Sequence, residues 1–116
     1  MMNKDMLDRM SEVRDEWCVS IYLPVAETDA SENRRQLTES IAEAARKLVA
    51  LGVAPQKTAR LLGPVEMILE NNGFWSDREE GFAAFFTDDS FVWYSIPHRF
   101  DKLVVVTDRF HLKPLI

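Results

Sequence analysis

The chain has 116 residues, of which 47% are apolar and 28% are charged, and its net charge is −5. This length predicts a single domain, residues 1–116, and the composition excludes a disordered chain. The acidic balance argues against a protein that binds nucleic acid over its whole surface, and no apolar run approaches the roughly 18 residues of a membrane-spanning helix. We therefore expect no membrane partner.

The single cysteine, Cys18, cannot form a disulfide within the chain. This usage is typical of a reducing compartment and favours a cytoplasmic location. Cys18 starts an apolar run, so we expect a small buried side chain rather than a nucleophile.

The first half of the chain predicts a short helix, a strand and a long helix. An apolar stripe with helical spacing runs through residues 3–16. Residues 17–24 form a continuous apolar run ended by a proline, as in a strand buried on both faces. Asp29 and Glu32 have the spacing of a helix-capping pair, and apolar residues then recur as far as Leu51. Gly52 is a natural residue to end that helix.

A second helix is predicted from Pro55 to the stop signal at residues 71–73, Asn-Asn-Gly. Pro64 lies inside it and lacks a backbone N–H, so we expect a kink or two shorter helices there. Phe74 and Trp75 follow directly and are expected to dock under the sheet.

The last third of the chain predicts a β-meander. Residues 81–86, 91–96 and 103–107 are strand-like runs separated by turn-forming segments. The fold class is therefore α+β: a mixed, mainly antiparallel sheet with two long helices on one face and a short N-terminal helix. Residues 108–116 are basic and apolar and end on Pro-Leu-Ile, which favours the N-terminal domain of a longer multidomain protein.

The residues predict no catalytic site. The four glycines lack the spacing of a phosphate-binding loop, and His98 and His111 have no cysteine near them that would complete a zinc site. Paired acids fall where turns are expected, as at Asp88 and Asp89. We therefore expect no catalytic residue, no metal ligand and no cofactor, and hence no enzyme.

Binding is the remaining class of function. From His98 onward the chain contains four Lys or Arg and two Asp, which gives a local charge of +2. The residues before His98 have a net charge of −7. Cations interleaved with Phe100, Phe110 and Tyr94 are the residue types that bind phosphate and stack on bases. The alternative is that the phenylalanines are core and the cations only keep an edge strand soluble. The candidate RNA-binding residues are Arg34, Arg35, Arg99, Lys102, Arg109, His111 and Lys113.

Three groups of residues together carry a resemblance to a known family. They are Cys-Val-Ser-Ile-Tyr-Leu-Pro at 18–24, Gly-Phe-Trp at 73–75 with Glu-Gly-Phe-Ala-Ala-Phe at 80–85, and Leu-Val-Val-Val at 103–106 with Arg-Phe-His-Leu-Lys-Pro-Leu at 109–115. The chain from residue 17 onward resembles the N-terminal domain of the bacterial members of the archaeal and eukaryotic peptide-chain release factor family, the relatives of Pelota. The last of these strings is the most specific.

The resemblance implies a non-catalytic domain that binds the ribosome or its RNA, in termination, rescue or hibernation, and that adjoins its own downstream domains. The Asn-Ile-Lys-Ser string with which eukaryotic members read stop codons does not occur here. The Gly-Gly-Gln motif for peptide release belongs to the family's middle domain. The alternative is a protein-interaction or dimerisation module without nucleic-acid contact. In that module residues 112–116 form an apolar interface, either with the protein's other domains or with a second copy in a homo-oligomer.

Overall fold

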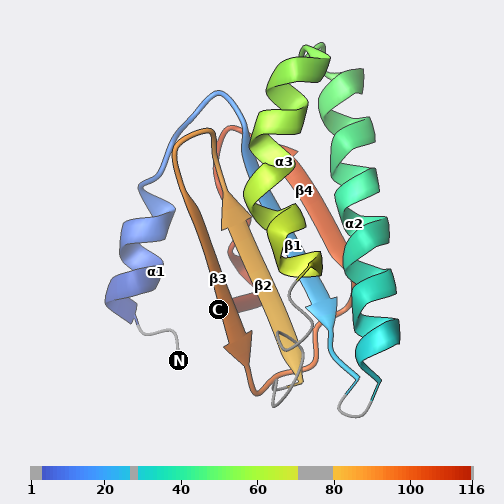
Figure 1. The fold of residues 1–116 in the computed structure, drawn as a ribbon. Helices are drawn as coiled ribbons and strands as arrows, with labels where there is room; N and C mark the ends of the chain where they lie inside the picture. Colours follow the sequence, from blue (N-terminus) through green and yellow to red (C-terminus); the bar gives the residue numbers. More distant parts are fainter. Residues whose placement is uncertain (1–3, 27–28, 71–79, 116) are drawn as a thin grey trace.

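The computed structural model describes residues 4–26, 29–70 and 80–115. Figure 1 shows the arrangement of the elements, with α and β segments labelled along the chain. The helices are α1 (Lys4–Ser11), α2 (Ala30–Ala50), α3 (Pro55–Leu69) and the short 3-10 helix η1 (Lys113–Leu115). The strands are β1 (Cys18–Pro24), β2 (Gly81–Phe86), β3 (Phe91–Ile96) and β4 (Leu103–Thr107).

The four strands form one sheet in the order β3-β2-β1-β4. β1 lies inside the sheet, where Ile21 pairs with Ala84 of β2 on one side and with Val104 of β4 on the other. The predicted α+β class, with two long helices on one face and a short N-terminal helix, is confirmed. All three pairings are antiparallel, so the parallel pair that a mixed sheet would contain does not occur among these strands.

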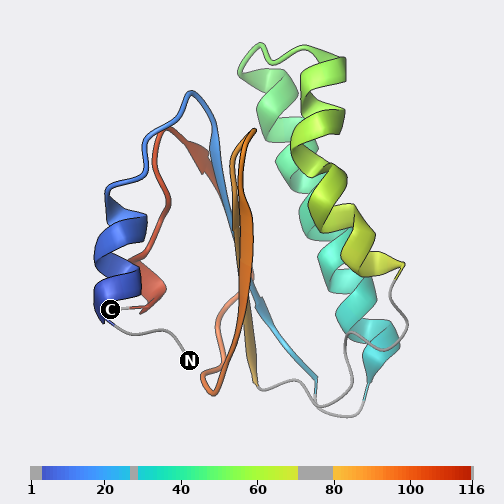
Figure 2. The same ribbon diagram turned by 60° about the vertical axis from the view of Figure 1, so that its left-hand side comes forward.

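Both faces of the sheet are covered. Figure 2 shows α2 and α3 on one side of the sheet, and α1 with the C-terminal segment on the other. Side chains of β1 alternate between the two sides, as strand geometry requires. Val19, Ile21 and Leu23 pack in the core under the helices, which we call the helix-side core. The opposite core, the C-terminal-side core, contains Met10, Cys18, Tyr22, Ala83, Phe85, Phe100, Phe110 and Leu112.

Helix α2 begins as its sequence predicts. The Asp29 side chain accepts a hydrogen bond from the backbone N–H of Glu32 at 2.9 Å, but the Glu32 side chain binds Arg35 instead of reaching back to the cap. Gly52 follows the helix with a φ of +91°, a conformation that favours glycine. Leu51 was expected in the apolar stripe but is 51% exposed, since it lies beyond the last turn that faces the sheet.

Helix α3 is continuous through Pro64, so the expected split does not occur. The residue before a proline is normally kept from helical geometry by a clash that involves its Cβ, and Gly63 has none. Pro64 itself is exposed, so water can reach the backbone carbonyl that loses its helical partner. The predicted stop at residues 71–73 and the docking of Phe74 and Trp75 lie outside the described residues.

The start of β2 packs closely against the loop between β3 and β4. A Cβ added to Gly81 would overlap the backbone oxygen of His98 and lie 2.8 Å from the Phe100 ring. Only glycine therefore lets this loop cross the end of β2, and the crossing places Phe100 in the C-terminal-side core.

We predict that Gly81→Ala lowers the free energy of unfolding by about 2 kcal/mol or more, because backbone and a buried ring must both move. Urea denaturation monitored by circular dichroism measures this. Gly63→Ala is the matched control, since its Cβ would meet no atom within 4 Å. Its helix-propensity gain and pre-proline cost oppose each other, so we expect a change below about 1 kcal/mol. Equal effects of the two substitutions would contradict the close-packing explanation.

Candidate nucleic-acid interface

The C-terminal segment, residues 108–115, crosses the sheet face opposite α2 and α3. Its backbone is fixed by two fully buried side chains of β1. The Ser20 hydroxyl accepts a hydrogen bond from the backbone N–H of His111 at 2.9 Å, and the Tyr22 hydroxyl donates to the His111 carbonyl. Both backbone groups of His111 are thus used to hold the segment on the sheet.

The aromatic part of the predicted interface is internal. Phe100 and Phe110 are only 4% and 7% exposed and pack in the C-terminal-side core, where Phe110 meets Phe85 edge-on at 5.4 Å between ring centroids. The expectation that they stack on bases is therefore wrong, and the core alternative is confirmed for both rings. Leu112 is also buried and Leu115 packs against the same core, so these two residues cover this protein's own sheet.

The seven predicted RNA-binding residues do not lie on one surface. Lys102 precedes β4 and Arg109 follows it, so about 20 Å of extended strand separates them. Arg34 and Arg35 lie in the first turns of α2, and Arg34 is half-buried with its Nε shielded from solvent. The His111 ring is half-buried and edge-on to Tyr22, which leaves it less accessible than a surface histidine.

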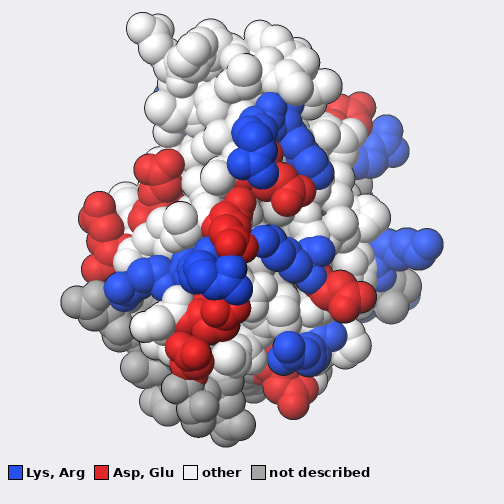
Figure 3. Space-filling model, turned by 90° about the vertical axis from the view of Figure 1, so that its right-hand side faces the viewer, with Lys and Arg blue, Asp and Glu red and all other residues white. Residues whose placement is uncertain are grey.

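Carboxylates neutralise the cations along α2. Arg35 pairs with both Glu32 and Glu39, and Glu39 also binds Lys102 at 3.0 Å, which joins the helix to the loop before β4. The hydrogen bond from Arg35 lowers the pKa of Glu32, and that from Lys102 lowers the pKa of Glu39. Figure 3 shows this face as alternating blue and red groups. Because Arg35, Lys47 and Lys102 each have a glutamate beside them, this face offers less net positive charge to a phosphate than its cations suggest.

The loop between β3 and β4 differs from that face. Arg99, Asp101 and Lys102 line a shallow pocket of about 400 Å³, to which Pro114 of the C-terminal segment also contributes. Lys113 adjoins Pro114 and is exposed, as is Arg99. Neither Arg99 nor Lys113 takes part in an ion pair within the part of the chain that the structure describes. We call Arg99, Lys102 and Lys113 the basic loop cluster. Arg109, in contrast, pairs with Asp108 at 3.2 Å.

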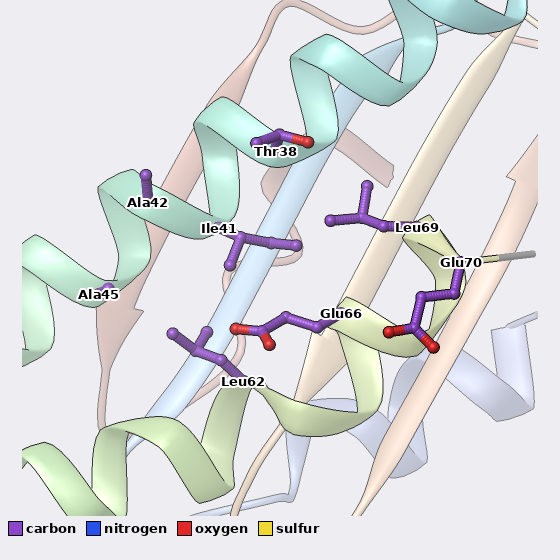
Figure 4. Close-up of a pocket in the computed structure, with 8 residues that line it drawn as sticks. All are labelled: Thr38, Ile41, Ala42, Ala45, Leu62, Glu66, Leu69 and Glu70. Atoms are coloured by element: carbon purple, nitrogen blue, oxygen red, sulfur yellow. The ribbon is translucent and has the colours of Figure 1, made fainter.

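The structure also contains a groove that the sequence did not indicate. It lies between α2 and α3, with Ile41 and Leu62 at its base and Glu66 and Glu70 on its α3 side (Figure 4). The sequence contains a signal for it, because Leu62, Glu66, Leu69 and Glu70 recur at the spacing of one helix face. That spacing alone is typical of any amphipathic helix, because only the packed helix pair shows that a groove remains between α2 and α3.

The described residues bring no cluster of metal ligands together. They contain no group of three or more His, Cys, Asp or Glu side chains placed to hold a metal ion. Cys18 is fully buried as predicted, and burial raises the pKa of its thiol, which disfavours the reactive thiolate. Among the helices described, none combines the length and apolarity needed to cross a membrane.

The sequence matches no protein-family model, and it matches no curated protein.

We predict that Tyr22→Phe lowers the free energy of unfolding by about 1–2 kcal/mol, since the half-buried His111 loses the donor to its carbonyl. Urea denaturation at neutral pH measures the change. Tyr94→Phe is the control, because no hydrogen bond of the Tyr94 hydroxyl is recorded among the described residues, and its cost should stay below about 0.5 kcal/mol. A Tyr22→Phe protein as stable as the wild type would show that the hydroxyl does not hold the segment.

The same hydroxyl predicts an alkaline transition. Burial raises the pKa of Tyr22 above its ordinary value of 10.0. A group whose pKa is higher in the folded state supports folding fully below its unfolded pKa, and this support is lost as pH rises above about 10. Stability of the wild type should therefore fall more steeply above pH 10 than that of Tyr22→Phe, by up to about 1.4 kcal/mol per pH unit. Parallel pH profiles for the two proteins would contradict this assignment.

Proposed function

We propose that this domain is a non-catalytic ribosome- or RNA-binding module, the N-terminal domain of a bacterial release-factor-like protein acting in translation or ribosome rescue or hibernation in the cytoplasm. The single observation that supports an RNA contact is the basic loop cluster. Arg99 and Lys113 are exposed there without a carboxylate partner among the described residues, beside Lys102 and a shallow pocket. Guanidinium and ammonium groups in this state are free to bind phosphate oxygens.

The resemblance supports the place of action. Its residues at 18–24, 80–85 and 103–106 fall on β1, β2 and β4, which are adjacent in the sheet. The string at 109–115 crosses the same strands from the C-terminal side. Among the described residues, the resembling strings thus form one continuous part of the fold, and Gly81 in one of them packs against the loop that carries Arg99 and Lys102.

Ion pairs within the domain reduce the number of cations that are free to bind a phosphate. Arg35 and Arg109 already have carboxylate partners, so a phosphate would have to displace an acid at each. Within the basic loop cluster, Lys102 already pairs with Glu39, which it shares with Arg35. It is therefore less free to bind a phosphate than Arg99 or Lys113. We therefore expect Arg99 and Lys113 to contribute most of the salt-dependent binding.

A second candidate function is a protein-interaction module without nucleic-acid contact. The observation that favours it is the apolar groove between α2 and α3. The groove shares no residue with the basic loop cluster, so the two functions can be tested separately.

The test is co-sedimentation of the domain with bacterial ribosomes through sucrose gradients at low and moderate salt. We expect Arg99→Glu/Lys113→Glu to abolish binding at moderate salt and to reduce the slope of log affinity against log salt by about 1.5, because each lost phosphate contact contributes about 0.7–0.9. Both side chains are exposed, so the variant should remain folded.

Arg9→Glu/Arg46→Glu is the matched control for that experiment. It makes the same change of net charge at exposed positions of α1 and α2 that take part in no ion pair among the described residues, and it should leave ribosome binding within about twofold of the wild type. An equal loss in both variants would show that net charge alone matters. Absence of wild-type binding at either salt would remove the RNA contact and leave the interaction module as the better function.

A further inference from the structure

The groove between α2 and α3 opens on the side of the helices away from the sheet, which lies behind them in Figure 4. Its volume is about 430 Å³, within the range of sites that hold a side chain or small ligand. Ile41 and Leu62 form its base and are 7% and 3% exposed, because they also belong to the helix-side core. The base is therefore fixed by the fold and needs no rearrangement to accept a partner.

The α2 side of the groove is formed by short side chains. Thr38, Ala42 and Ala45 line it, and their short side chains leave the helix backbone close to the opening. A second helix laid along this side could approach closely and insert apolar side chains between α2 and α3. Ridges of one helix that enter the grooves between others are the usual geometry of helix packing.

The α3 side of the groove carries negative charge that no cation among the described residues neutralises. Glu66 and Glu70 are exposed, lie four residues apart on one helix face and have no ion-pair partner recorded in the described ranges. The glutamates of α2 differ, since Glu32, Glu39 and Glu43 each pair with a neighbouring cation. Like charges at this spacing repel each other, so Glu66 and Glu70 would be stabilised by a cation supplied from outside.

An exposed apolar side chain adjoins the acids. Met67 lies between them in sequence and is 70% exposed. Methionine is flexible and polarisable, and such side chains are common on surfaces that adapt to a partner. Met67 lies outside the lining of the groove itself. The apolar base, the short side chains of the α2 side and the two glutamates of the α3 side together fit a helix with one apolar face and basic residues beside it.

We propose that the α2–α3 groove binds a basic amphipathic helix of a partner protein. Its apolar residues enter the space over Ile41 and Leu62, and its Lys or Arg residues pair with Glu66 and Glu70. A second copy of this chain is the poorer occupant, because a symmetric contact between two grooves would bring four carboxylates together. The basic loop cluster uses other residues, so this binding does not depend on the RNA contact.

The probe is a fluorescein-labelled 14-residue peptide of Leu and Lys, with Leu at helical spacing on one face, and the matched peptide has Glu in place of Lys. Fluorescence anisotropy with the 116-residue chain measures binding. We expect the Leu/Lys peptide to bind and the Leu/Glu peptide not to bind. Glu66→Lys/Glu70→Lys should weaken the Leu/Lys peptide by about tenfold or more and admit the Leu/Glu peptide, since two attractions become repulsions.

Asp8→Lys/Glu12→Lys is the matched control, with the same charge change and the same spacing at exposed positions in and just after α1, on the opposite face of the sheet. It should change the affinity of the Leu/Lys peptide by less than about threefold. Ala42→Gln tests the groove without altering charge. The longer side chain projects from an exposed position on the α2 side of the groove and blocks the peptide there. It should weaken binding of the Leu/Lys peptide by about fivefold or more.

Three results would overturn the proposal. One is an equal loss of affinity in the two charge-reversed variants, which would mean attraction to net negative charge. Another is unchanged binding in Ala42→Gln, which would place the peptide elsewhere. The third is a wild-type dimer in sedimentation equilibrium that Ala42→Gln dissociates, because the groove would then hold a second copy. Circular dichroism and urea denaturation of every variant show that the compared proteins are folded.

Discussion

A strand that is apolar on both faces can only lie in a sheet that is covered on both sides, and β1 imposes this condition here. Six of its seven residues are buried. Val19, Ile21 and Leu23 require the helices, while Cys18, Ser20 and Tyr22 require the C-terminal segment. Because burial of apolar area is the main stabilising contribution to folding, neither cover can be removed without exposing the centre of the sheet. The two covers therefore act as parts of one fold.

This condition separates structural from functional residues in the string at 109–115. Phe110 and Leu112 are buried, and the backbone of His111 is bound by β1, so these positions hold the second cover in place. Lys113 alone among its cations projects from the segment without an acid beside it in the described residues. The most specific part of the family resemblance thus reports mainly on the fold. A role in binding has to come from side chains that the cover leaves outside.

Local signals predicted the elements well because each depends on neighbours in sequence. The Asp29 cap, the positive φ of Gly52 and the continuous apolar run of β1 are of this kind. The candidate interface was harder, since its character depends on pairs far apart in the chain. Lys102 meets Glu39 across 63 residues, and Gly81 meets His98 and Phe100 only because a loop crosses the end of β2. No composition window contains such contacts, so charge was counted correctly but its pairing could not be foreseen.

The charged side chains that have no partner of opposite sign indicate what each surface of this domain can bind better than the net charge does. Across the described residues, the cations of the α2 face are largely neutralised by acids, and the same holds for Arg60 with Asp88 and Arg109 with Asp108. What remains is a small cationic excess around the basic loop cluster, where Arg99 and Lys113 outnumber Asp101, and an anionic pair of glutamates along the groove. Exposed ion pairs contribute little to stability, but each removes a charge from the field that a partner meets. The proposed phosphate contact and the proposed binding of a basic helix are therefore compatible in one acidic protein, since neither surface contains a residue of the other.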